Sequence, residues 1–128
     1  EKNLLPTFDQ ALSALLTDLE QRGLLDETLV VAMGEMGRTP KANDKWGRGH
    51  WSTLFPAVLA GAGIQGGLIY GETDRDAAYA TTRPTSPEDL AATIYDALGI
   101  DYRGSIVDRQ GRPHALVNGG QPLYELFS

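Results

Sequence analysis

The 128-residue sequence contains no cysteine. This absence excludes disulfides, thiolate catalysis and thiolate metal sites, so any metal must be bound through oxygen or nitrogen. It does not identify the compartment, because exported bacterial proteins often lack cysteine too. Long hydrophobic runs are also absent: no stretch is long enough to cross a bilayer, and no signal peptide is visible.

Basic residues are scarce. There are 11 Lys and Arg against 17 Asp and Glu, a net charge of −6, and no window concentrates the basic residues. We therefore expect no nucleic-acid-binding surface, because phosphate binding needs clustered positive charge. The hydrophobic content of 41% is ordinary for a globular protein, and residues 1–128 correspond to a single domain. Because the sequence begins with Glu1, we expect an upstream region in the intact protein.

The first third of the sequence predicts a helix followed by a strand. Leucines and Phe8 recur at helical spacing up to residue 19, Thr7 with Gln10 fits a capping box, and Gly23 ends the helix. The segment Thr28–Met33 is short, apolar and rich in β-branched residues, which is typical of an interior parallel strand. A helix, a turn and a buried strand make half of a crossover unit, so the expected fold class is α/β with a mainly parallel sheet.

The middle of the sequence predicts a loop and two further strands. Residues 34–53 show no hydrophobic period and contain many glycines and charges, which indicates a long functional loop. Leu54–Ala60 predicts a second strand, with Pro56 in its first residues or on a sheet edge. Leu68–Gly71 predicts a short β segment flanked by turns.

The last third contains the clearest local signals. Ser86 as N-cap and Pro87 at the first helical position predict a second helix, which Gly99 ends. The residues Arg109–Pro113 predict a turn. The tail Pro122–Phe127 is apolar enough to dock on the body of the domain.

Two polar clusters follow the first predicted strand. Residues 34–40 read Gly-Glu-Met-Gly-Arg-Thr-Pro, and residues 45–51 read Lys-Trp-Gly-Arg-Gly-His-Trp. In open α/β sheets ligands gather at the carboxyl ends of strands, so a carboxylate, an imidazole and several cations at this point make a candidate site.

The order of these parts resembles the C-terminal part of the alkaline phosphatase and sulfatase superfamily. More narrowly, the two clusters and the segment Leu-Ala-Gly-Ala-Gly-Ile-Gln-Gly-Gly at residues 59–67 resemble a bacterial, sulfatase-like family known as DUF1501. The resemblance covers nearly the whole chain and roughly the last third of a full family member. It implies a three-layer α/β sandwich with a mainly parallel sheet, of which this chain is the C-terminal fragment, in an exported or periplasmic protein.

The resemblance implies metal-dependent hydrolysis of sulfate or phosphate esters. Sulfatase-like enzymes usually carry Ser-Asp-His-Gly, with two metal ligands, where this chain has Gly-Glu-Met-Gly. Glu35 keeps a carboxylate, whereas Met36 cannot replace an imidazole. The metal ligands implied here are Glu35 and His50, and the ion is calcium, magnesium, manganese or zinc.

The same resemblance implies roles for the cations. Such a reaction needs positive charge to hold the anionic ester, and a guanidinium fork matches tetrahedral oxyanions. Arg38, Lys41 and Arg48 are the candidate substrate-binding residues, and Arg38 and His50 are the candidate catalytic ones. The nucleophile and the first metal-binding acid of the superfamily are not in this chain.

Each of these residues also has a structural interpretation. Glu35 can pair with Arg38 or accept backbone amides of its turn, His50 can be a hydrogen-bonded structural histidine, and His114 is expected to be a solvated or turn residue. Two functions therefore remain open: the C-terminal half-site of a hydrolase completed by a missing N-terminal region of the same protein, or a non-catalytic structural or binding domain. In either case a fragment of a larger sheet exposes an edge or an apolar face, which predicts self-association or marginal stability.

Overall fold

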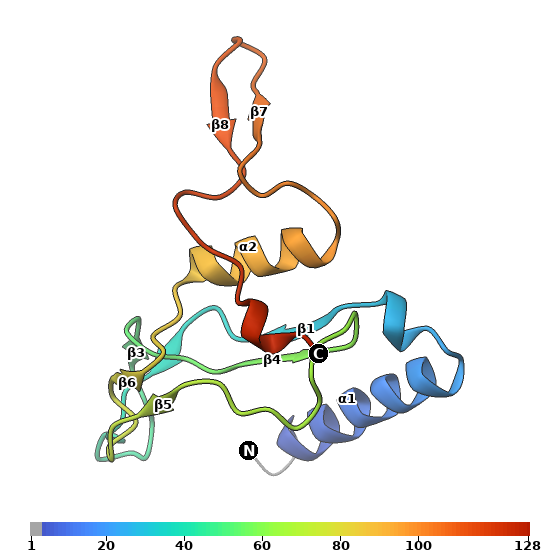
Figure 1. The fold of residues 1–128 in the computed structure, drawn as a ribbon. Coiled ribbons are helices and arrows are strands. Elements are labelled where there is room, and N and C mark those ends of the chain that lie inside the picture. The colour runs from blue at the N-terminus through green and yellow to red at the C-terminus, as the bar shows by residue number, and fades with distance from the viewer. Residues whose placement is uncertain (1–3) are drawn as a thin grey trace.

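The computed structural model describes residues 4–128 (Figure 1). In this range six short strands lie between the two α-helices, and two more strands follow the second helix. In chain order the elements are α1 (Leu4–Gln21), the 3-10 turn η1 (Leu25–Glu27), β1 (Val30–Met33), β2 (Gly37–Arg38), β3 (His50–Trp51), β4 (Ala57–Ala60), β5 (Glu72–Thr73), β6 (Ala80–Thr82), α2 (Pro87–Ala97), β7 (Ser105–Val107), β8 (Pro113–Ala115) and the 3-10 turn η2 (Tyr124–Leu126).

Helix α1 confirms the first predicted helix and its end. Gly23 has a φ of +67°, its amide donates to the Glu20 carbonyl over 3.0 Å, and the Leu24 amide donates to the Leu19 carbonyl over 2.8 Å. This is the glycine-dependent closure that the sequence predicts. The capping prediction is wrong, because the helix already runs from Leu4 and Thr7 lies inside it. Neither helix in the described range is both long and apolar enough to cross a membrane.

Helix α2 confirms the second predicted helix. The Ser86 side chain accepts from the Asp89 amide over 3.0 Å, and the Asp89 carboxylate accepts from the Ser86 amide over 2.9 Å, which completes a capping box. Pro87 occupies the first turn, where its missing N–H costs no hydrogen bond. Gly99, with a φ of +71°, ends the helix as predicted.

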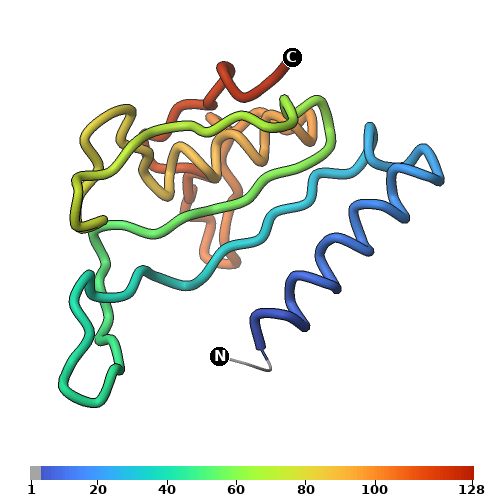
Figure 2. The backbone as a smooth tube through the Cα atoms, turned by 90° about the horizontal axis from the view of Figure 1, so that it is seen from below, coloured from blue at the N-terminus to red at the C-terminus, as the bar shows by residue number. Residues whose placement is uncertain are grey.

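The predicted fold class is wrong. In residues 4–128 all strands pair antiparallel in four two-stranded sheets, not in a three-layer sandwich with a mainly parallel sheet. Strands β1 and β4 lie side by side, with Val30 opposite Ala60 and Met33 opposite Ala57 (Figures 1 and 2). Between them the chain runs out through β2 and returns through β3 without a crossover helix, so β4 returns antiparallel to β1.

Three finer predictions for the middle of the chain differ from the structure. Residues 34–53 are not a structureless loop, because β2 and β3 pair within them. The second strand is shorter than predicted and begins at Ala57, directly after Pro56. No strand forms at residues 68–71, where Gly71 has a φ of +80° and the Ile69 side chain is 87% exposed; the next strand is β5.

The most buried part of the described chain surrounds α2. Leu90, Ala92 and Thr93 are buried on this helix, and Leu126 is buried in the tail. The Thr93 hydroxyl donates to the Asp89 carbonyl over 2.7 Å and accepts from the tail amide of Leu123 over 2.9 Å. The predicted docking of the tail is therefore confirmed.

The predicted turn at residues 109–113 lies in the β7–β8 hairpin. This hairpin projects away from α2 (Figure 1).

Candidate functional site

The candidate site is organised by the pairing of β2 with β3. Gly37 lies opposite Trp51 and Arg38 lies opposite His50. Gly37 is buried, and a Cβ atom at this position would lie 1.7 Å from the carbonyl oxygen of Leu54. Only glycine fits there. Gly37 belongs to the first polar cluster, residues 34–40, so that cluster itself contains the residue that allows the two clusters to meet.

Glu35 and Arg38 form an ion pair at this site. The Arg38 Nη2 donates to Glu35 Oε1 over 2.7 Å, and both side chains are partly exposed, at 46% for Arg38 and 66% for Glu35. The pKa of the Glu35 carboxyl is lowered, chiefly by its backbone amide, then by the Arg38 charge and to a smaller extent by His50. Glu35 is therefore a carboxylate at neutral pH and lies within the electrostatic reach of His50.

The other two predicted cations lie on the loop between β2 and β3. The Arg48 Nη1 donates to the carbonyl oxygens of Thr39, over 2.6 Å, and Pro40. Lys41 is exposed, and its carbonyl accepts from the Thr39 hydroxyl over 3.0 Å. The structure thus brings Glu35, Arg38 and His50 together. The Arg48 guanidinium is hydrogen-bonded within the loop between β2 and β3.

The described residues do not complete a metal site. In residues 4–128 no three His, Asp or Glu side chains lie close enough together to hold an ion. Glu35 and His50 supply one oxygen and one nitrogen donor, which is fewer than the three protein ligands of a typical catalytic zinc site and the six or more oxygens around calcium. The described residues therefore do not fit a resident metal without further ligands.

The family comparison agrees with the site motifs. The family model described as "Protein of unknown function (DUF1501)" matches residues 1–127. The chain belongs to the DUF1501 family. No curated protein and no solved structure matches it.

Trp51 links the site of this DUF1501 chain to the β5–β6 region. Its indole Nε1 donates to the Ala78 carbonyl over 2.8 Å, and its ring meets Tyr79 edge-on with the centroids 5.6 Å apart. Ala78 is buried, and its amide donates to the Asp74 carboxylate over 2.7 Å. Sequence reasoning missed this support, because the contact joins residues 27 positions apart and no local pattern records it.

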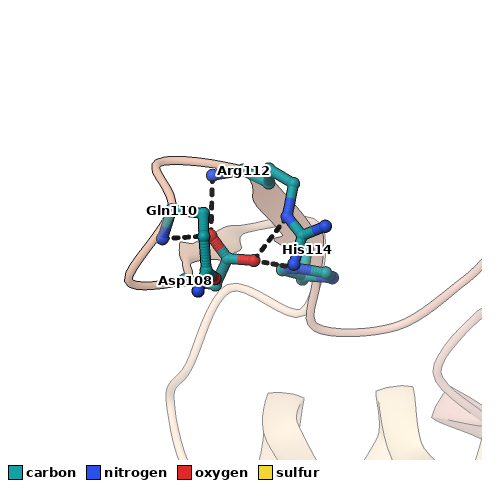
Figure 3. Close-up of polar contacts among 4 residues, drawn as sticks. All are labelled: Asp108, Gln110, Arg112 and His114. Atoms are coloured by element: carbon teal, nitrogen blue, oxygen red, sulfur yellow. Dashed lines mark hydrogen bonds and ion pairs between the residues drawn. The ribbon is translucent and has the colours of Figure 1, made fainter.

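The most strongly shifted carboxyl of the described chain lies elsewhere, in the β7–β8 hairpin (Figure 3). The pKa of Asp108 is lowered to about 2, chiefly by the Arg112 amide and then by a hydrogen bond with His114. Its carboxylate also accepts from the Gln110 amide over 2.9 Å and from Arg112 Nε over 2.7 Å. Asp108 thus organises a tight turn. In the sequence an Asp two residues before Gln110 and three before Gly111 is typical of such a turn.

His114 lies on strand β8 and not in a turn, and its side chain is solvated as expected. Its Nε2 lies 3.1 Å from Asp108 Oδ2, and its side chain is 57% exposed on the projecting hairpin. The hairpin and the β2–β3 pair lie at opposite ends of the ribbon in Figure 1. The two histidines of this DUF1501 chain therefore belong to separate clusters.

Proposed function

We propose that this DUF1501 chain supplies one half of the reaction centre of a metal-dependent hydrolase of sulfate or phosphate esters. In this proposal Glu35 and His50 each give one ligand to a divalent ion, and Arg38 holds the anionic oxygens of the ester. The remaining ligands and the nucleophile come from a segment outside these residues. The observation that carries the proposal is the β2–β3 pairing, which gathers a carboxylate, an imidazole and a guanidinium.

The electrostatics of the site support this assignment. A metal ligand must be deprotonated, and the lowered pKa of Glu35 keeps its carboxylate ionised well below neutral pH. Arg38 is exposed enough for a dissolved anion to reach it. In the proposal, the guanidinium of Arg38 would bind the anionic oxygens of the ester.

The sulfatase-like ancestry belongs to the same proposal. It rests on the Gly-Glu-Met-Gly sequence at residues 34–37, which keeps the acid of the superfamily motif and loses its histidine. With one oxygen and one nitrogen donor, the donor set suits zinc or manganese better than calcium or magnesium. Substrate oxygens would be held by hydrogen bonds and charge, so the proposal covers both sulfate and phosphate esters.

A second candidate is a non-catalytic domain that keeps the family fold without its chemistry. Three observations favour it: the Glu35 carboxylate is already paired with Arg38, the Arg48 guanidinium is hydrogen-bonded to backbone carbonyls, and residues 4–128 offer only two of the ligands. In this alternative the cluster stabilises the loop between β2 and β3 and binds no ester.

The test compares Glu35→Gln with Glu72→Gln in the protein expressed from its native gene and purified without chelators. Glu72 is an exposed acid on β5, so its variant controls for the loss of one negative charge. We expect wild type and Glu72→Gln to retain one divalent ion and to hydrolyse an aryl sulfate or aryl phosphate. Glu35→Gln should weaken metal binding at least about tenfold.

Two results would contradict the hydrolase proposal. Equal metal retention by Glu35→Gln and Glu72→Gln would remove Glu35 from the ligand set. A wild-type protein that retains no metal and cleaves neither ester would favour the non-catalytic domain.

A further inference from the structure

The loop between β2 and β3, residues 39–49, forms an arm that projects from the body of the domain (Figure 2). Asn43 closes the tip of this arm. Its amide donates to the Gly47 carbonyl over 2.8 Å, and its side-chain oxygen accepts from the amides of Lys45 and Gly47 over 3.0 Å and 2.9 Å. These bonds flank Trp46, whose φ of +59° is a left-handed conformation that is unfavourable for a bulky residue. The arm therefore holds a tryptophan at its tip in one defined backbone conformation.

The side chain of Trp46 is the most exposed large apolar group in the described part of the chain, at 89%. It makes no hydrogen bond or ring contact with another described residue, whereas the indole of Trp51 donates to the Ala78 carbonyl and contacts Tyr79. Exposed aromatic rings on a fixed backbone are typical anchors of binding surfaces. The arm thus presents a flat apolar face to a ligand.

The lysines of the arm have no acidic partners. Lys41 and Lys45 are exposed, and neither forms an ion pair with a described acid, whereas five arginines outside the arm do. Residues 39–49 contain three basic residues and one acid, a net charge of +2 in a chain of −6. Positive charge around an apolar ring favours a ligand that is both anionic and flat-faced.

We propose that the arm binds an anionic polysaccharide. Trp46 stacks on one sugar ring, and Lys41 and Lys45 bind sulfate or carboxylate groups on neighbouring sugars. The C–H groups on one face of a sugar ring pack flat against an indole, whose π face is partly negative. The exposed carboxylate of Asp44 can accept hydrogen bonds from sugar hydroxyls.

An anionic membrane fits this surface less well. Insertion of Trp46 into a lipid interface would bring Asp44, two residues earlier, against negatively charged headgroups. One indole also offers little apolar area compared with the apolar face of a membrane-binding helix. The inference goes beyond the proposed function, because binding of the polymer needs neither the metal nor the nucleophile.

The test measures binding of dextran sulfate, a sulfated glucose polymer, to the protein expressed from its native gene, with a chelator present. Polyvinyl sulfate is the control ligand, because it carries sulfate groups but no sugar rings. We expect Trp46→Ala to weaken binding of dextran sulfate at least about tenfold and binding of polyvinyl sulfate less than about twofold. Ile69→Ala is the matched control variant, since that side chain is 87% exposed outside the arm, and it should bind both polymers as wild type does.

A second pair of variants tests the charges. Lys45→Gln should weaken binding of both polymers several-fold, because each carries sulfate groups. Arg109→Gln removes an exposed cation on the β7–β8 hairpin that forms no ion pair with a described acid, and it should weaken binding much less.

Four results would overturn the proposal. Wild-type protein could bind dextran sulfate no better than unsulfated dextran. Trp46→Ala could weaken both polymers equally, which would leave charge without stacking. Vesicles containing phosphatidylglycerol could bind more tightly than dextran sulfate, which would assign the arm to a membrane. Trp46→Ala could lower the thermal unfolding midpoint by several degrees, which would mean that Trp46 packs against another part of the protein. Because the chelator removes any metal, none of these results depends on the proposed hydrolysis.

Discussion

Gly37 lies where β2 passes closest to the backbone of Leu54. A methyl group there would meet a carbonyl oxygen at 1.7 Å and a second one, of Trp51, at 2.7 Å. We therefore predict that Gly37→Ala destabilises the fold by about 1–3 kcal/mol, because the backbone must shift to relieve overpacking. Urea unfolding measures this free energy. Gly66→Ala is the matched control, since nothing lies within 4 Å of that position, and equal effects of the two variants would contradict the packing argument.

Asp108 predicts a pH dependence that is confined to the β7–β8 hairpin. Its pKa falls from an ordinary value of 3.8 to about 2 in the folded state, because the Arg112 amide and His114 stabilise the carboxylate. A lowered folded pKa means that the carboxylate stabilises the hairpin above about pH 4, and that this contribution is lost as the pH falls from about 4 towards 2. The Gln110 and Arg112 amide shifts in NMR spectra should report this titration.

Asp108→Asn provides the control for that titration. The amide oxygen can still accept from the turn, but it has no proton to gain, so the two amide shifts should stay flat between pH 4 and 2. A wild-type titration centred on the ordinary value would show that the turn does not stabilise the charged form.

Single residues were predicted from the sequence only where their partners are local. The pairing of Glu35 with Arg38, three positions apart, was one of the two interpretations that the sequence offered. The Arg48 guanidinium was expected to face an anion, yet it meets carbonyls eight and nine positions away, because the conformation of the intervening loop decides its partners.

At the scale of elements, helix ends were predicted well and strand pairing was not. Ser86, Pro87 and Gly99 act through neighbours within one turn, so the sequence contains the complete signal for α2. An apolar β-branched run such as residues 30–33 indicates a buried strand, but the same run suits parallel and antiparallel pairing. The orientation of β1 and β4 depends on the path of the chain between them, which no local pattern determines.

The capping box of α2 gives a prediction at this scale. Ser86→Ala removes the acceptor for the Asp89 amide and the donor at 2.7 Å to its carboxylate, and we expect a loss of about 1 kcal/mol in the free energy of unfolding. Chemical denaturation followed by circular dichroism measures it. Ser13→Ala on α1 is the control, because that exposed hydroxyl only donates to the Gln10 carbonyl. The prediction is contradicted if both variants unfold at the same denaturant concentration.

At the scale of the whole molecule, the sheet, the helix and the candidate site share one property: each is incomplete within residues 4–128. The β1–β4 sheet has a free apolar edge, α1 has an uncovered stripe, and Glu35 and His50 are two donors without a third. The expectation of an exposed edge and face came from the resemblance to a larger fold, whereas the expected arrangement of a mainly parallel sheet was wrong.

The most direct measurement of the proposed half-site is the intact mass of the protein from its native source, with divalent metal quantified on the same sample. We predict a polypeptide well above 13.8 kDa that retains about one divalent ion per chain. A polypeptide of 13.8 kDa without bound divalent metal would contradict it, because Glu35 and His50 would then have no further ligands with which to hold an ion.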